Sequence, residues 1–302
     1  MRTDYEIFKT LLYFDLFDYP LTKNEIFRFL EQKTEMEELT RKLQQLILEK
    51  KIWQLDEFYS LQNNQKLVER RRTGNARAGI FLNKATWISR LLSQFPYVRA
   101  IGISGSVSKN YADEYADIDY FIITKTNRLW IARTLMHLYK KLPFIKDRKK
   151  FYCMNYYIDE SELQIEEQNI YTATELVTMM PMYGNGSIDN FYAANQWALI
   201  YFPNLQLQGK KYQSKSKDHW AKVMFEAILN NRIGDWLDNY FFRLTTKRWK
   251  LKEEQGRLNT KGERMGLKTS KHCSKPNPIF FHNSFMNRYE HKLEEMKQKW
   301  NT

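Results

Sequence analysis

Cysteine is nearly absent from this chain, which has only Cys153 and Cys273 among its 302 residues. A disulfide framework and a zinc site built from several thiolates both need more cysteines at closer spacing, so both are excluded. His272 precedes Cys273, but no second pair at finger-like spacing exists, and a zinc finger is not predicted. Cys153 falls in an apolar stretch without a basic neighbour to lower its pKa, and we interpret it as an inert core residue.

Long apolar runs are also absent, so the sequence predicts no membrane span and no membrane partner. The chain begins with a charged, amphipathic stretch rather than a signal-peptide pattern, which favours a cytoplasmic protein. We find no internal repeat, no Walker loop and no Ser-His-Asp arrangement. Repeat architectures, P-loop nucleotide hydrolases and serine hydrolases are therefore not predicted.

Hydrophobic and basic residues are plentiful. The chain is 43% hydrophobic and 15% aromatic, enough to build a core distributed over two or three domains. Its net charge of +13 suits a polyanionic partner such as nucleic acid, because lysines and arginines that neutralise phosphates release counterions. A basic balance also simply keeps a protein in solution, so both interpretations stay open.

Residues 1–62 show three helical patterns followed by a short hairpin around Asp56 and Glu57, which is the layout of a winged-helix module. Capping boxes are predicted at Thr22 with Glu25 and at Thr34 with Glu37. The third helix would begin among glutamates that repel phosphates. This favours a packing or protein-contact role over reading of DNA.

The rest of the chain predicts an α/β (α+β) fold with two further parts. Residues 63–182 alternate between helical and strand patterns, beginning with a long or broken helix in which Gly74 and Gly79 mark a weak point. Residues 183–302 read as a basic, helical C-terminal region. Within it, residues 250–278 are polar and basic, which indicates a mobile loop or a segment facing nucleic acid.

The first part of the candidate site is a strand that runs from Val98 into a tight Gly105-Ser106 turn, after which a short helix can begin. Backbone N–H groups at such a turn suit phosphate oxygens. Gly105 would let the backbone approach closely, and the Ser106 hydroxyl adds a donor. Lys109 lies either near these phosphates or on the surface.

The second part is the run Asp117-Ile118-Asp119, which opens the next apolar strand. Residues two apart in a strand point to the same side, so both carboxylates should face one point. Two like charges held so close are costly unless a cation binds between them. Mg²⁺ (or Mn²⁺) is the natural candidate, although a solvated strand entrance would also explain the pair.

Together, the Gly-Ser turn and the Asp-hydrophobic-Asp strand resemble the signature of the DNA polymerase beta type nucleotidyltransferase superfamily. The wider chain is similar to predicted prokaryotic nucleotidyltransferases with an N-terminal winged helix. This similarity covers most of residues 1–205 and is weakest over the basic C-terminal third. The stretches that carry it are residues 103–106, 116–119, 127–130, 152–156, 195–197 and 203–204.

The resemblance implies a palm-like mixed sheet and transfer of a nucleoside monophosphate from an NTP donor to an acceptor hydroxyl, with release of pyrophosphate. It implies that Asp117 and Asp119 are catalytic and hold Mg²⁺ on the triphosphate. Gly105 and Ser106 would bind the β- and γ-phosphates, with Lys109 close by. The nucleotide and the acceptor stay open.

One departure from the family pattern concerns the third acid, which active members usually supply from a later strand. We expect Asn155 at that position, and a neutral amide cannot act as a base. Asp159 shares its strand face but lies too far along. The alternative function is therefore a catalytically degenerate nucleotidyltransferase that acts as a nucleic-acid-binding or regulatory scaffold.

Overall fold

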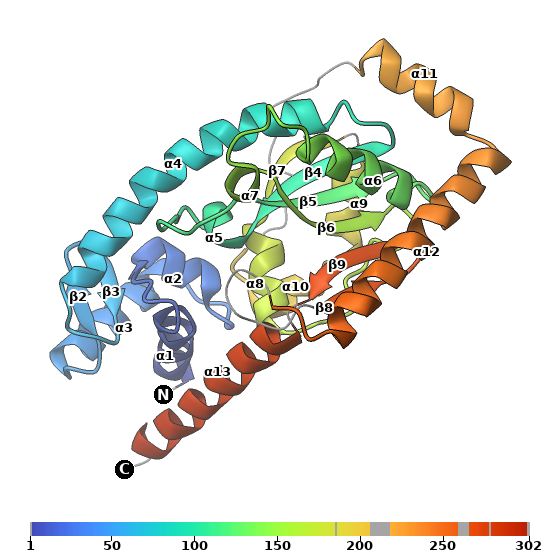
Figure 1. Ribbon diagram of the computed structural model, residues 1–302. Helices are drawn as coiled ribbons and strands as arrows, with labels where there is room; N and C mark the ends of the chain where they lie inside the picture. Colours follow the sequence, from blue (N-terminus) through green and yellow to red (C-terminus); the bar gives the residue numbers. More distant parts are fainter. Residues whose placement is uncertain (1, 185, 206–217, 259–265, 278, 301–302) are drawn as a thin grey trace.

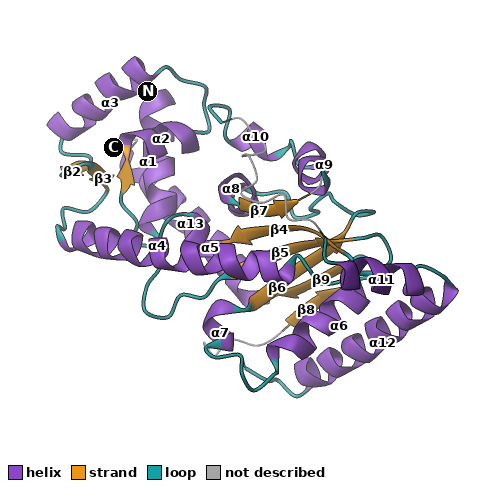
Figure 2. Cartoon of the chain, turned by 90° about the horizontal axis from the view of Figure 1, so that it is seen from above, coloured by secondary structure: helices purple, strands orange, loops and turns teal. Residues whose placement is uncertain are grey.

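The computed structural model of the chain describes residues 2–184, 186–205, 218–258, 266–277 and 279–300. Its centre is a mixed six-stranded sheet with helices on both faces, and a smaller helical module lies at one end (Figures 1 and 2). The predicted mixture of helices with one mixed sheet is confirmed. In spatial order the strands are β7 (Met180–Gly184), β4 (Val98–Ser104), β5 (Asp119–Thr124), β6 (Cys153–Asp159), β9 (Cys273–Asn277) and β8 (Gly266–Thr269).

Strand β5 pairs in parallel with β6, and all the other neighbours in this sheet are antiparallel. The parallel pair needs a crossover, which α6 (Leu129–Lys140) and the short α7 (Arg148–Phe151) supply. Apolar side chains alternate along the central strands. Ile101 and Ile122 join the cluster that includes α4 (Lys66–Leu92) and α6, whereas Ala100 and Phe121 join the cluster on the opposite face.

That opposite face is covered by α8 (Ile170–Thr178), α9 (Ser187–Ala194) and α10 (Ala198–Tyr201). The same apolar cluster continues into the N-terminal module, which we define as residues 2–60. It also includes Phe285 and Tyr289 of the last helix, α13 (Ile279–Trp300). Tyr13 of the module meets Phe285 with ring centroids 5.2 Å apart. The two ends of the described chain therefore pack together (Figure 1).

The N-terminal module has the predicted helices and hairpin, and its small sheet has the order β1-β3-β2. The capping box of Thr22 and Glu25 is confirmed, with both of its hydrogen bonds present. The box at Thr34 is wrong, because α3 begins one residue later, with Glu35 at its N-cap. The Thr34 N–H instead donates to the side chain of Asn204, 3.1 Å away, which anchors this loop. The module's elements are α1 (Arg2–Asp15), β1 (Leu21–Thr22), α2 (Lys23–Phe29), α3 (Met36–Leu48), β2 (Trp53–Leu55) and β3 (Phe58–Ser60).

Helix α4 is continuous from Lys66 to Leu92 and connects the module to the sheet (Figure 2). Gly74 does not break it. A Cβ at this position would lie 2.2 Å from a ring carbon of Tyr111, so the glycine makes room for that ring. Near the start of α4 the buried Arg71 donates to the Pro20 carbonyl and to Glu25, at 2.8 and 2.7 Å. These contacts fasten the module to α4.

The C-terminal region differs from the prediction of helices alone. Residues 250–278, predicted as a mobile loop or a segment facing nucleic acid, contain β8 and β9, which extend the sheet. Residues 259–265 and 278 lie outside the described chain. Two helices of this region are α11 (Trp220–Leu229) and α12 (Arg232–Glu254), and Asn231 caps the second with its side chain. Among the described residues, no helix is both long and apolar enough to cross a bilayer.

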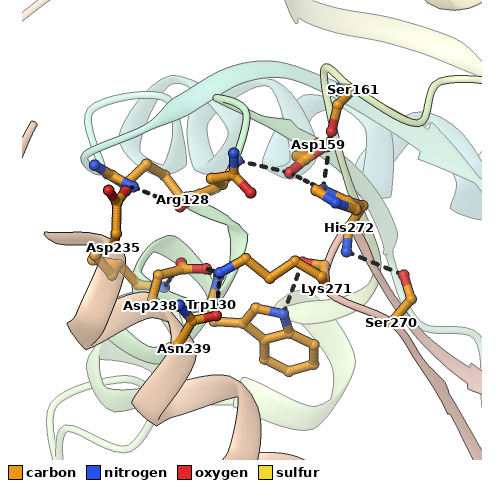
Figure 3. A network of polar contacts seen from close by, with 12 residues as sticks. Arg128, Trp130, Asp159, Ser161, Asp235, Asp238, Asn239, Ser270, Lys271 and His272 are labelled. Carbon is orange, nitrogen blue, oxygen red and sulfur yellow. Dashed lines mark hydrogen bonds and ion pairs between the residues drawn. The ribbon is translucent and has the colours of Figure 1, made fainter. Parts of the chain in front are cut away.

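A polar network fastens α12 and the β8–β9 hairpin to the sheet (Figure 3). One carboxylate oxygen of Asp238 accepts from the backbone N–H groups of Trp130 and Ile131, at 2.8 and 3.0 Å, and so caps α6. The Lys271 ammonium lies 3.0 Å from the other oxygen of Asp238. On the next residue, the His272 ring contacts the buried carboxylate of Asp159 at 2.8 Å.

Candidate metal and phosphate site

The Gly105-Ser106 turn ends β4 and opens the four-residue helix α5 (Gly105–Ser108). Gly105 has φ +75°, a conformation that glycine adopts without a steric penalty. A Cβ at Gly105 would lie 2.5 Å from the Oδ2 of Asp119. Glycine is therefore required here for two reasons, and the turn packs directly against the second of the predicted carboxylates.

The two aspartates lie at the entrance of β5. Asp119 is its first residue, opposite Ser104 on β4 and Cys153 on β6, whereas Asp117 belongs to the preceding loop. Between them, the Ile118 N–H donates to the Lys150 carbonyl at 2.9 Å. Ligand atoms of Asp117, Asp119 and Cys153 all lie within 4.8 Å of one another. The prediction that the two carboxylates face one point is confirmed, although only one of them is in the strand.

Cys153 is the neighbour of this pair that sequence reasoning missed. Its half-buried thiol has a raised pKa, first because burial disfavours the thiolate and then because the charges of Asp119 and Asp117 repel it. The thiol is therefore protonated at neutral pH, which agrees with the prediction of low reactivity but not with a plain core position. The side chain of Asn155 lies outside the described residues. Asp159 pairs with Thr124 at the far end of β5.

Glu175, on α8, occupies the Gly-Ser turn. Its carboxylate accepts from the Gly105 N–H at 3.0 Å and from the Lys109 ammonium at 2.6 Å. Lys109 also donates to the Gly105 carbonyl at 3.1 Å, so it lies in the turn and not on the open surface. A carboxylate thus sits where the sequence predicts phosphate oxygens. Sequence reasoning missed Glu175 because 66 residues separate it from Lys109.

A cavity of about 600 Å³ is lined by five of the predicted site residues, Gly105, Ser106, Lys109, Asp117 and Asp119. Much of the remaining wall is aromatic, and part of it comes from α1 of the N-terminal module. The Tyr19 hydroxyl, at the end of this wall, donates to the Lys109 carbonyl. The aromatic lining residues are Tyr13, Phe14, Phe17, Tyr19, Tyr111, Tyr115 and Tyr171.

The carboxylates in this cavity can bind Mg²⁺ if phosphate oxygens supply further ligands. Magnesium prefers oxygen ligands and is usually bound by one or two carboxylates together with substrate phosphates. Asp117 and Asp119 supply the two carboxylates, whereas the protonated thiol of Cys153 is a poor ligand for a hard ion. The site therefore suits a metal ion that also binds phosphate oxygens.

The chain was compared with family models, with curated proteins and with solved structures, and it matches none of them. Its function is therefore inferred from the residues of the cavity and their geometry. The features that carry most information are the convergence of the carboxylates, the phosphate-like position of Glu175 and the aromatic wall.

Proposed function

We propose that this protein is a nucleotidyltransferase that moves a nucleoside monophosphate from an NTP to a hydroxyl group. The observation that carries the proposal is the direct packing of the Gly-Ser turn against Asp119, with Asp117 beside it, in one cavity. Such a turn binds phosphates, and such a carboxylate pair holds the metal ion that accompanies them. In this proposal the central sheet is the palm-like sheet of the polymerase beta superfamily, and the N-terminal module is its winged helix.

The triphosphate would bind at the turn, with its terminal phosphates on the Gly105 N–H, the Ser106 hydroxyl and the Lys109 ammonium. Glu175 now accepts from two of these donors, so its side chain has to turn away when phosphate oxygens take its place. Asp117 and Asp119 would hold Mg²⁺. When bound, Mg²⁺ neutralises charge on the triphosphate and on the leaving pyrophosphate.

In the transfer step, the acceptor hydroxyl oxygen forms a bond with the α-phosphorus of the NTP. The bond from that phosphorus to the oxygen bridging to the β-phosphate breaks, and pyrophosphate leaves with the electron pair. The hydroxyl proton passes to a carboxylate of the pair or to water, because the Cys153 thiol is already protonated. The chain's own contribution is to position the reactants and to stabilise charge.

The aromatic wall suits the nucleobase of the donor. Tyr13 of α1 and Phe17, in the turn that follows this helix, offer ring faces and edges in the same cavity as the turn at Gly105, together with Tyr111 and Tyr171. Stacking on aromatic side chains is a common way to bind a base without selecting its identity. The guanidinium of Arg70 lies 4.7 Å from the centre of the Tyr111 ring and adds a positive charge to this wall.

The test is calorimetric titration of each of the four NTPs with Mg²⁺ into three proteins. They are the wild type, the Asp117→Asn/Asp119→Asn variant and the Asp56→Asn/Glu57→Gln control, which loses the same charge from the exposed tip of the hairpin. The wild type and the control should bind at least one NTP, and the aspartate variant should bind it at least about tenfold more weakly. No binding to the wild type at millimolar NTP would contradict the proposal.

A second candidate function is nucleotide binding without efficient transfer, in a scaffold or regulatory role. It is favoured by Cys153, a protonated thiol where a third acid would be useful. Release of labelled pyrophosphate separates the two functions. The scaffold predicts Mg²⁺-dependent NTP binding with no pyrophosphate above the level of the aspartate variant, whereas the enzyme predicts a clear excess.

A further inference from the structure

Residues 140–150 form a strongly basic surface segment that neither the predicted sites nor the proposed donor site uses. Six of its eleven residues are basic, and Asp147 is its one acid. Lys146, Arg148 and Lys149 are exposed. None of these three makes an ion pair with a carboxylate in the described parts of the chain. Their charges are therefore available to a partner.

This basic segment borders the carboxylate pair. It joins α6 to α7 and leads directly into β6, which begins at Cys153. The carbonyl of Lys150 accepts from the N–H of Ile118, the residue between the two aspartates, at 2.9 Å. Burial lowers the pKa of Lys140, at the other end of the segment, and the carboxylate of Asp117 opposes this shift, so Lys140 lies near the pair.

The donor groups lie on the other side of the same carboxylates. Asp119 has β4 and the Gly-Ser turn on one side and β6 on the other. In-line transfer at phosphorus requires the attacking oxygen to approach opposite the leaving group. If pyrophosphate leaves from the turn, as the proposed function requires, the acceptor hydroxyl must come from the β6 side, where the basic segment lies.

We propose that the acceptor is the 3′ end of a single-stranded nucleic acid, whose phosphates bind the segment 140–150. This inference rests on the proposed function for its in-line geometry. The exposed cations are spread along the segment and line a hollow on its surface, which suits a chain of phosphates better than a single one. Phe144 lies between the exposed Lys141 and Lys146 in sequence and is 67% exposed, and an exposed ring offers a stacking face to an unpaired base.

In the resulting step, the 3′-hydroxyl oxygen of the strand forms the new bond to the α-phosphorus of the NTP. Pyrophosphate leaves, the hydroxyl proton passes to water, and the strand becomes one nucleotide longer. The segment acts by binding and orienting the strand. Its side chains need not touch the reacting atoms.

The test compares two triple variants that lose the same positive charge. Lys146→Ala/Arg148→Ala/Lys149→Ala removes three exposed cations from the basic segment. Its control, Lys33→Ala/Arg41→Ala/Lys50→Ala, removes three exposed cations from the N-terminal module, whose winged-helix layout could also bind nucleic acid. The probes are short 5′-labelled RNA and DNA strands of one sequence, and binding is measured by fluorescence anisotropy over a range of salt concentrations.

We expect the segment variant to bind the strands at least about tenfold more weakly than the wild type does. The slope of log affinity against log salt should also become shallower by about 2, because each of the three lost phosphate contacts on a single strand removes roughly 0.7. The control should stay within about twofold of the wild type. A wild type that binds neither strand, or a control that loses as much as the segment variant, overturns the inference. The RNA and DNA arms show which polymer is preferred.

Two further readouts keep this inference separate from the proposed function. In NTP calorimetry, the segment variant should bind NTP as the wild type does. If the wild type binds NTP but no strand, the acceptor assignment alone is overturned. Strand binding without any NTP binding overturns the proposed function, and with it the assignment of the strand as acceptor. Incubation with labelled NTP should extend a strand with a free 3′-hydroxyl but not one blocked by a 3′-phosphate, and equal labelling of both would also overturn the assignment.

Discussion

At the residue scale, the sulfur of Cys153 lies within 4.8 Å of carboxylate oxygens of Asp117 and Asp119. We expect Cys153→Asp to lower the stability of the metal-free protein by about 1–3 kcal/mol, because a third negative charge joins a half-buried pair. Mg²⁺ should restore the lost stability, and it should bind this variant more tightly than it binds the wild type. Thermal unfolding in chelator and in Mg²⁺, with calorimetry of Mg²⁺ alone, measures both effects.

The matched control for this change is Cys153→Ser, which replaces the thiol by a neutral group of similar size. Its thermal unfolding should respond to Mg²⁺ as the wild type does. If Cys153→Asp unfolds at the same temperature with and without Mg²⁺, the thiol does not face the position of the metal ion.

The second residue-scale prediction concerns Glu175, whose carboxylate accepts from the Gly105 N–H and the Lys109 ammonium. Glu175→Gln should tighten NTP binding by about tenfold, because a negative charge that competes with phosphate oxygens is removed. Calorimetry with Mg²⁺ and NTP measures the change. Glu162→Gln, at an exposed position before α8, is the control and should bind as the wild type does. Weaker binding by Glu175→Gln would show that Glu175 supports the donor site.

At the element scale, the N-terminus of α6 is capped by a side chain from another helix. No side chain of its own N-cap residue, Arg128, caps the helix; the cap comes from Asp238 on α12, which accepts from Trp130 and Ile131. We expect Asp238→Ala to cost roughly 2–3 kcal/mol, because two backbone donors lose a charged partner and the Lys271 ammonium loses its ion pair. Urea unfolding measures this loss.

Glu253→Gln removes one carboxylate from an exposed position of the same helix and serves as the control, with an expected change within about 0.5 kcal/mol. An Asp238→Ala protein as stable as this control would mean that the network of Figure 3 contributes little to folding.

Only some of the strands in the central sheet could be predicted from the sequence. Local patterns predicted β4, β5 and the strand that carries Asn155, because alternation and flanking turns are visible along the chain. They missed β7, which contains Pro181, and also β8 and β9, which lie in a polar, basic stretch. These strands are short and pair at or near the sheet edges, where the partner strand rather than the local sequence decides the conformation.

At the scale of the whole molecule, the donor cavity lies between the sheet and the N-terminal module, because α1 and Tyr19 line it together with the Gly-Ser turn. A ligand in this cavity should hold the module in place. We expect saturating NTP with Mg²⁺ to slow hydrogen exchange of α1 amides, and at about a hundredfold excess over the dissociation constant to add about 2.7 kcal/mol of stability. Exchange measured by mass spectrometry checks this.

The Asp117→Asn/Asp119→Asn variant is the control for this measurement, since it should lose the ligand and therefore the protection. Protection of the sheet without any change in α1 would show that the nucleotide does not reach the aromatic wall. Equal protection in the variant would show that binding does not depend on the carboxylates.

The sequence by itself determined the features that depend on neighbours along the chain. The capping box of Thr22 and Glu25 and the turn at Gly105 follow from local hydrogen bonding and backbone freedom. The close spacing of Asp117 and Asp119 also predicted that their carboxylates converge, although Asp117 lies in the loop before β5 and not in the strand. These interactions span a few residues, so they can be read from spacing.

Only the tertiary structure decided what surrounds that site. The parallel register of β5 and β6 brings Cys153 to Asp119, the packing of α8 brings Glu175 into the turn, and the folding back of α1 supplies the aromatic wall. Each of these contacts joins segments that are distant in sequence. Their register depends on how apolar faces pack and how strands pair across the whole molecule, and no local pattern contains that information.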